Sequence, residues 1–265
     1  MPSYFERLDD ERYRPTAHTG GAWDPDEQHF SPLGGLMVHA IDRSAASSER
    51  AGMRLSRISF DILGRLARED FTVHVATVRP GRTIELVEAT VVIGERTAVR
   101  GRAWLLAAGD TCAVAGGEAP ALEAPHGLAA LDLTSVWHGG YIASLDMRAI
   151  GRPRPGRATA WISTDLDLVA GEPSGPLARY VALVDTANGV AVRVQPGEWI
   201  FPNVDLTIHL HRQPAGRWVG LDTTVVFGPE GQGVTSTVLH DLAGQVGHAQ
   251  QILTIRCAPG GGSGT

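Results

Sequence analysis

The sequence predicts an α+β protein built from two similar units, and three observations support this. The 265-residue chain is long enough for two domains of ordinary size. Two segments, 31–42 and 175–185, are alike: each opens with a proline suited to the first turn of a helix and continues as an amphipathic helix. Each lies just upstream of a tract rich in β-branched residues. A helix followed by antiparallel strands, present twice, is therefore expected.

Strands are predicted where apolar and polar residues alternate between turn-forming residues. Four follow the first helix, as expected for an antiparallel meander, at 55–63, 71–78, 83–93 and 97–107. In the second unit two precede the helix and four follow it, at 141–150, 158–168, 199–211, 218–227, 233–241 and 245–256.

An Ala-, Gly- and Pro-rich stretch at 109–133 has little periodicity and is predicted to be a surface linker. The Gly-rich tail is expected to be disordered by its composition. The predicted division is an N-terminal unit at 1–118, a linker at 119–135, a C-terminal unit at 136–258 and a tail at 259–265.

Composition excludes several classes of function. The net charge is −6 and the arginines are scattered, which argues against nucleic acid as a partner. The polar N-terminus and the lack of a long apolar run predict a cytoplasmic protein with neither a signal peptide nor a membrane span. Cys112 and Cys257 lack the spacing of a disulfide framework or a metal clip, and no cofactor is predicted.

The C-terminal tract carries a specific pattern. Asp205 precedes the pair His211-Arg212, Trp218 opens the next predicted strand, and Gln251 lies five residues before Arg256. This pattern resembles the second half of acyl-CoA thioesterase II. In the N-terminal half, the segment 30–35 ahead of the helix and the pair Gly81-Arg82 are similar to features of the same family, so the resemblance covers nearly the whole chain.

The resemblance implies a double hotdog fold, in which each sheet wraps around a long helix. Two such units side by side can pair their edge strands into one continuous sheet, which removes exposed edges. The resemblance also implies a role in lipid metabolism and an acyl-CoA, or another acyl thioester, as the partner. A homodimer or a larger oligomer is a further expectation.

In this family an Asp, a Thr or Ser, and a Gln of the second unit are described as positioning a water against the thioester carbonyl. Asp205 and Gln251 fall on two of these positions. Counted without gaps from Trp218, the third position holds Val226. Thr224 is the nearest hydroxyl on the same strand face and is the candidate third member.

The residue types suit this chemistry. A carboxylate such as Asp205 can accept a proton from the attacking water. Strand alternation places Asp205 with Thr207, opposite an apolar row that is expected to face the core. Gln251 is an amide in an otherwise apolar row and requires a specific partner. The alternatives are a solvated surface carboxylate for Asp205 and a structural hydrogen-bonding group for Gln251.

The segment Gly34-Gly35-Leu36 is a candidate oxyanion site. Glycines at a helix start leave backbone N–H groups uncovered, and these donors suit a carbonyl oxygen that gains negative charge. The alternative is that the two glycines only permit close packing of the helix.

Other residues give weaker signals. His209 and His211 could bind a divalent metal, but no further ligands follow at a suitable spacing, so no metal site is predicted. His29 lies in an acidic loop before the first helix and is either near the site or simply solvated. Trp23, Trp199 and Trp218 are expected to pack.

The predicted function is hydrolysis of a fatty-acyl thioester to free acid and CoA, with Asp205, Gln251 and Thr224 as catalytic residues. The alternative is a double hotdog protein that binds acyl-CoA without catalysis, because Val226 replaces the hydroxyl. A hydratase acting on enoyl-CoA is a third possibility, for which the first helix offers His39 and Asp42.

Overall fold

The structure, a computed structural model, describes residues 2–21, 23–46, 52–117 and 120–258, and the predicted tail lies outside these ranges. The first half contains one long helix, α1 (Phe30–Ala46), with Pro32 in its first turn. The strands of this half are β1 (Ser3–Arg7), β2 (Arg12–Pro15), β3 (Met53–Ile62), β4 (Phe71–Arg79), β5 (Ile84–Ile93) and β6 (Arg96–Ala107).

The second half contains α3 (Pro176–Val184), with Pro176 in its first turn, and the short helices α2 (Gly140–Ala143) and α4 (Ala187–Val190). Its strands are β7 (Leu145–Arg154), β8 (Arg157–Thr164), β9 (Asp167–Val169), β10 (Trp199–Ile200), β11 (Asp205–Leu210), β12 (Val219–Phe227), β13 (Gln232–Asp241), β14 (Gly244–Thr254) and β15 (Arg256–Cys257).

Two expectations need correction. The predicted strand at 141–150 begins as α2, and the one at 199–211 is divided into β10 and β11 by a loop. Both differences lie next to the cavity described below.

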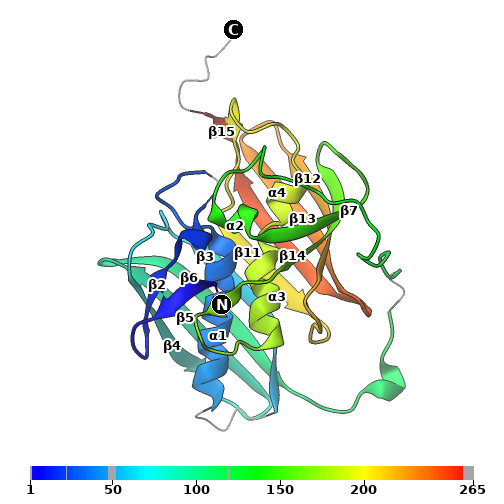
Figure 1. Ribbon diagram of the computed structural model, residues 1–265. Coiled ribbons are helices and arrows are strands. Elements are labelled where there is room, and N and C mark those ends of the chain that lie inside the picture. Colours follow the sequence, from blue (N-terminus) through cyan, green and yellow to red (C-terminus); the bar gives the residue numbers. More distant parts are fainter. Residues whose placement is uncertain (1, 22, 47–51, 118–119, 259–265) are drawn as a thin grey trace.

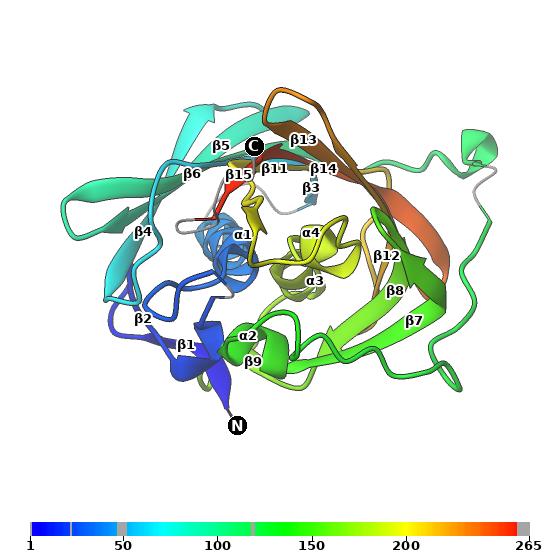
Figure 2. The same cartoon turned by 90° about the horizontal axis from the view of Figure 1, so that it is seen from above.

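In the described residues, strands of both halves form one 13-stranded sheet, in the order β7-β8-β12-β13-β14-β11-β3-β6-β5-β4-β2-β1-β9, while β10 and β15 pair with each other. The halves join where β11 pairs antiparallel with β3, with Thr207 opposite Ser59. Seen from above, the sheet curves around α1 and α3, which lie side by side inside it (Figure 2). The double hotdog architecture with a continuous sheet is confirmed.

The helices α1 and α3 run antiparallel. Gly35 lies against Ala178 and Ala182, while His29, ahead of α1, lies near Asp185 at the end of α3. A β-carbon added at Gly35 would come within 2.5 Å of the Ala182 β-carbon and 2.7 Å of the Ala178 carbonyl oxygen. Only glycine therefore permits this helix contact.

Between β6 and α2, the described residues 108–117 and 120–130 contain no strand or α-helix and run along the outside of the molecule (Figure 1). The chain then touches the second half where the Leu131 N–H donates to the Met147 carbonyl. The division of the chain into units stays a prediction. Within the described residues, no helix combines the length and hydropathy needed to cross a membrane.

Candidate functional site

A cavity of about 430 Å³ lies where the two halves meet. The first half contributes the loop before α1 and the loop after β3. The second half contributes the end of α3, the turn into α4 and the loop before β11. Among the residues that line it are Trp23, His29, Phe30, Arg65, Trp137, Asp185, Asn188, Asn203 and Arg256.

Within the described residues, two carboxylates line this cavity: Glu27, which pairs with Arg65, and Asp185, which caps the C-terminal end of α3. The Asp185 side chain is only 5% exposed. Oδ1 accepts hydrogen bonds from Asn203 Nδ2 and from Gln251 Nε2, both at 2.8 Å. Because both amides hold the same oxygen, Oδ2 is the oxygen that remains for a ligand in the cavity.

The environment of Asp185 suits a base. Burial raises the pKa of its carboxyl to about 6, although the hydrogen bonds from Asn203 and Gln251 act in the opposite direction. The carboxylate is therefore ionised at pH 7, yet it accepts a proton more readily than an exposed Asp.

His29 borders the same oxygen, with Nδ1 3.8 Å from Asp185 Oδ2. Nδ1 accepts the Ser31 N–H at 3.1 Å, which implies that Nε2 carries the proton. Burial lowers the pKa of His29 to about 3, so the ring is neutral and forms no ion pair with Asp185 at neutral pH.

Tyr141 supports this corner of the site from α2. Its ring stacks on His29 with centroids 4.2 Å apart, and its hydroxyl lies 2.6 Å from Thr186 Oγ1. Burial raises the pKa of Tyr141 well above its ordinary value, so the hydroxyl stays protonated. Tyr141 thus joins the loop before α1 to the end of α3.

Trp23 and Trp137 form an aromatic wall on another side of the cavity, with the buried Phe201 packed behind them. Trp23 meets Trp137 and Phe201 edge-on, with centroids 4.8 and 5.2 Å apart. Trp137 is fixed by a hydrogen bond from its Nε1 to the Gly189 carbonyl. Trp23 packs as expected, but it remains 40% exposed. The wall offers an apolar surface for an acyl group.

Gln251 lies on the inner face of β14 and has the specific partner that its apolar row required. That partner is Asp185 and not Asp205. Thr207 is paired with Gln250, and Asp205 shares the face of Thr207, so Gln251 points to the other side of the sheet. The expected convergence of Asp205 and Gln251 is therefore wrong.

Asp205 has a different environment from the one predicted. Its Oδ1 accepts the Ile252 N–H, and Asp61 lies opposite it on β3. Burial is the main cause that raises the pKa of Asp205, with the nearby Asp61 charge adding to it. Asp205 does not line the cavity, although its charge contributes to the raised pKa of Asp185.

Thr224 and Val226 also lie on the outer face of the sheet. Thr224 accepts a hydrogen bond from Arg157 at 3.0 Å, and Val226 is 57% exposed. Thr224 is therefore not the third member of this site. Since Val226 points outward, a hydroxyl at that position would not reach the cavity either.

The predicted oxyanion segment, Gly34-Gly35-Leu36, does not lie at the start of the helix as expected. The helix α1 begins at Phe30. Gly34, Gly35 and Leu36 therefore lie beyond the first helical turn, where their N–H groups bond within the helix. Gly35 serves the contact with α3, and Leu36 is fully buried. The backbone donors at the cavity belong to the first turn of α1, next to His29.

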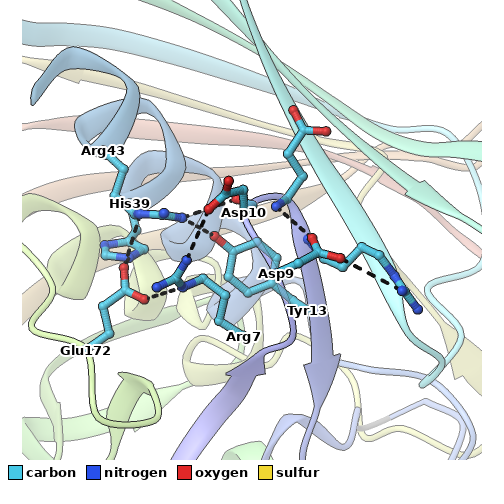
Figure 3. A network of polar contacts seen from close by, with 9 residues as sticks. Arg7, Asp9, Asp10, Tyr13, His39, Arg43 and Glu172 are labelled. Atoms are coloured by element: carbon cyan, nitrogen blue, oxygen red, sulfur yellow. Dashed lines mark hydrogen bonds and ion pairs between the residues drawn. The ribbon is translucent and has the colours of Figure 1, made fainter. Parts of the chain in front are cut away.

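His39, the candidate for hydratase chemistry, lies outside the cavity. Its Nε2 is 2.9 Å from Glu172 Oε1, and Glu172 also pairs with Arg7 and Arg43 (Figure 3). These residues belong to the opposite end of the α1–α3 pair. Neither His39 nor Asp42 lines the cavity.

His209 lies on β11, and His211 follows directly after the end of that strand. In the described ranges, no group of three or more His, Cys, Asp or Glu side chains is arranged to hold a metal ion.

Asp185 and Asn203 were not predicted from the sequence as site residues. The signal was present, because Asp185 is a carboxylate at the end of a predicted amphipathic helix whose other residues on that turn are apolar. An acidic side chain there must either be solvated or have buried partners.

Comparisons with known proteins agree with this architecture. Family models match both halves: the acyl-CoA thioesterase N-terminal domain at residues 19–106 and the C-terminal domain at residues 110–255. No protein among those with curated descriptions matches the chain.

Three solved structures illustrate the similarity of fold. An acyl-CoA thioesterase II, TesB2, from Mycobacterium marinum is 17% identical with a TM-score of 0.66, and the match covers 97% of each chain. A tesB protein from Mycobacterium avium subs paratuberculosis is 15% identical, with a TM-score of 0.68 and 96% of each chain covered. A conserved hot dog protein of unknown function from Alicyclobacillus acidocaldarius is 13% identical, with a TM-score of 0.74 and the same coverage.

Proposed function

The chain belongs to the acyl-CoA thioesterase family, and from this premise we propose that it hydrolyses an acyl-CoA to a carboxylic acid and CoA with Asp185 as general base. The observation that carries the proposal is a buried carboxylate that lines the cavity, whose Oδ1 is held by two amides while no hydrogen bond to Oδ2 is formed within the described residues. Family membership supplies the class, thioester hydrolysis, and the residue roles are our proposal.

The reaction requires one water and one base. Asp185 Oδ2 takes a proton from a water molecule while the oxygen of that water attacks the thioester carbonyl carbon. The carbon–sulfur bond of the tetrahedral intermediate then breaks, and the leaving thiolate receives the proton from Asp185. Asn203 and Gln251 hold the carboxylate during both transfers, and Gln251 is assigned a positioning role because it contacts Asp185.

The oxygen that becomes negative requires donors. In the first turn of α1 the Ser31 N–H is already bonded to His29 Nδ1, and Pro32 has no N–H. The N–H groups that remain are those of Phe30 and Leu33, which have no acceptor within the helix, and the helix dipole favours negative charge at this end. His29 and Phe30 place this end of α1 at the cavity. We therefore assign the oxyanion position to the first turn of α1 in place of Gly34 and Gly35.

The thioester acyl group is assigned to the aromatic wall of Trp23 and Trp137, which line the cavity and pack on the buried Phe201. The binding-only alternative rested on Val226. Since Val226 faces outward, that residue no longer argues against catalysis.

The test is release of free CoA thiol across a panel of acyl-CoAs of increasing chain length. Asp185→Asn is compared with Asp205→Asn, a matched change of a carboxylate on the other face of the sheet. We expect Asp185→Asn to abolish most of the release and Asp205→Asn to retain it. Absence of turnover by the unaltered protein on every thioester, or full activity of Asp185→Asn, would refute the proposal.

A further inference from the structure

Two polar atoms on the inner face of the sheet, next to Asp185, lack a partner. Thr235 Oγ1 and Gln251 Oε1 are buried and have no hydrogen-bond partner among the described residues. Each residue is 1% exposed. Unpaired polar atoms this deeply buried are rare because they lose their hydrogen bonds to water, and each one calls for a functional or structural reason.

The two residues are directly opposite one another. Thr235 on β13 is the antiparallel partner of Gln251 on β14, and both side chains point inward. Opposite side chains on one face have β-carbons about 4.5–5.5 Å apart. A threonine hydroxyl at this position can donate to the glutamine Oε1, either after a small side-chain rotation or through one bridging water.

The direction of the Gln251 amide is decisive for the site. Nε2 donates to Asp185 Oδ1, and this leaves Oε1 as an acceptor that requires a donor. If the amide turned over, Oε1 would face the Asp185 carboxylate, and two acceptors would be in contact. While Asp185 is ionised this orientation is unfavourable, but it becomes accessible once Asp185 takes a proton during turnover.

We propose that Thr235 is the positioning hydroxyl of the active site, which donates to Gln251 Oε1 and so keeps Nε2 directed at Asp185. The inference rests on the proposed function. It also gives the site a hydroxyl from β13, whereas the sequence pointed to β12. On β12 the residue opposite Thr235 is Val225, which is buried and offers no polar group.

A neighbouring pair on the same face provides the contrast. Thr237, two residues along β13, is buried like Thr235, but its Oγ1 lies 3.0 Å from Thr223 Oγ1. Thr237 therefore already has a partner, and within the described residues the side-chain hydrogen bonds to Asp185 come from Asn203 and Gln251 and not from this pair. It is the matched control for Thr235, since replacement of either threonine by valine keeps the shape of the side chain.

The first experiment compares the kinetics of Thr235→Val, Thr235→Ser and Thr237→Val on the thioester that the unaltered protein hydrolyses best. We expect Thr235→Val to lower kcat about 2–10-fold, as for loss of one hydrogen bond, with KM nearly unchanged. The low-pH limb of kcat/KM should move to higher pH, because a less well oriented amide stabilises the ionised carboxylate less. Thr235→Ser should restore both values.

Two kinetic results would overturn the inference. One is a Thr235→Val variant with the kcat and the pH profile of the unaltered protein. The other is a Thr237→Val variant with the same loss and the same shift, which would indicate a general effect of removing a hydroxyl from this face.

A second measurement does not need turnover. The ionisation of the Asp185 carboxyl is followed by carbon-13 NMR in the unaltered protein and in Thr235→Val, with the resonance assigned from Asp185→Asn. We expect a higher Asp185 pKa in Thr235→Val, and an unchanged value would overturn the inference. If instead Asp185→Asn still hydrolyses thioesters, the proposed function fails while this titration still decides the role of Thr235.

Discussion

Each end of the α1–α3 pair contains a carboxylate beside a histidine, but the pKa of the carboxyl is raised at one end and lowered at the other. At one end His29, before α1, lies near Asp185, at the end of α3. At the other end Glu172, before α3, lies against His39 on α1. Both contacts place a carboxylate beside a histidine, and both join the two halves of the chain. The difference lies in the charges around each carboxylate.

Glu172 is compensated by cations. Arg7 and Arg43 lie within 2.7 and 3.2 Å of its oxygens (Figure 3). Burial alone would raise the pKa of Glu172, but the hydrogen bond with His39 and the nearby positive charges together hold it below its ordinary value. Desolvation lowers the pKa of His39, so we treat His39 as a neutral donor and the arginines as the ionic partners.

Asp185 has amide partners only, and no ion pair with an arginine is recorded for it in the described part of the chain. Burial therefore dominates and raises its pKa. The comparison shows how one fold can use a carboxylate in two ways. Surrounding cations make Glu172 a structural link between halves, whereas neutral donors leave Asp185 able to take a proton at neutral pH.

The largest expected effect is a difference in kcat between variants at the two ends of the α1–α3 pair. Asp185→Asn is expected to lower kcat by about 10²–10⁴-fold, the usual contribution of a general base, since the amide cannot accept the proton of the water. Glu172→Gln should leave kcat within about threefold, because Glu172 does not line the cavity. Steady-state thiol release measures both. Equal losses in the two variants would contradict the division of roles.

The pH dependence should report Asp185. Its raised pKa means that the base is protonated below about pH 6, so kcat/KM is expected to fall about tenfold per pH unit below that value. His29 is not expected to contribute to this limb, since its pKa is about 3. Rates in overlapping buffers from pH 4.5 to 8.5 provide the measurement. A profile that is flat down to pH 4.5 would argue against Asp185 as the base.

Stability should change with opposite signs at the two ends. The folded protein prefers Asp185 protonated, so its ionisation above about pH 6 costs stability, and Asp185→Asn should gain on the order of 1–3 kcal/mol at pH 8. This gain should shrink as the pH falls from about 6 through the ordinary Asp value of 3.8, because below that value the carboxyl is protonated in both the folded and the unfolded state. Glu172→Gln should lose about 1–2 kcal/mol at pH 8, because Arg7 and Arg43 lose their ionic partner.

Denaturant unfolding at pH 8 and pH 4 measures these changes. Asp205→Asn is the control for removal of a carboxylate outside the α1–α3 pair. A loss of stability in Asp185→Asn at pH 8 would contradict the account of its pKa.

Between the two ends, the glycines of α1 test the helix contact. Gly35→Ala should destabilise the protein by about 1–2 kcal/mol, because the new β-carbon meets the backbone of α3. Gly34→Ala should be nearly neutral, since its β-carbon would meet the side-chain rings of Phe30 at 3.3 Å and Phe60 at 3.8 Å and no backbone atom of α3 is among its nearest neighbours, while alanine favours the helix. Thermal unfolding compares the two. If both variants are equally stable, the close approach of α1 and α3 does not require Gly35.

Much of the fold could be predicted from the sequence. The prolines of the two helix starts and the alternation along the strands gave α1, α3 and most strands with nearly the right bounds, because these signals are local. The alternation of apolar and polar residues predicted a strand at 141–150, and it could not show that Tyr141–Ala143 form a helix. This segment is shaped by its contacts with the loop before α1, where Gly140 packs on Ala17.

The candidate site was only partly predictable. Gln251 was identified because an amide in an apolar row requires a partner, and strand alternation already placed Asp205 on the opposite face from the core. The partner itself came from a helix and a loop, Asp185 and Asn203. The choice of Asp205 rested on spacing along one strand, which says nothing about which helix end approaches the sheet.

The amino-acid sequence by itself determined the duplicated α+β architecture, the family and the face on which each strand residue lies, since these depend on local periodicity and on motifs within one segment. Only the tertiary structure decided which carboxylate serves the cavity. The antiparallel packing of α1 on α3 brings His29 to Asp185 at one end and Glu172 to His39 at the other. Burial shifts the pKa values of these side chains, and they become buried only when segments that are distant in the sequence pack together and exclude water.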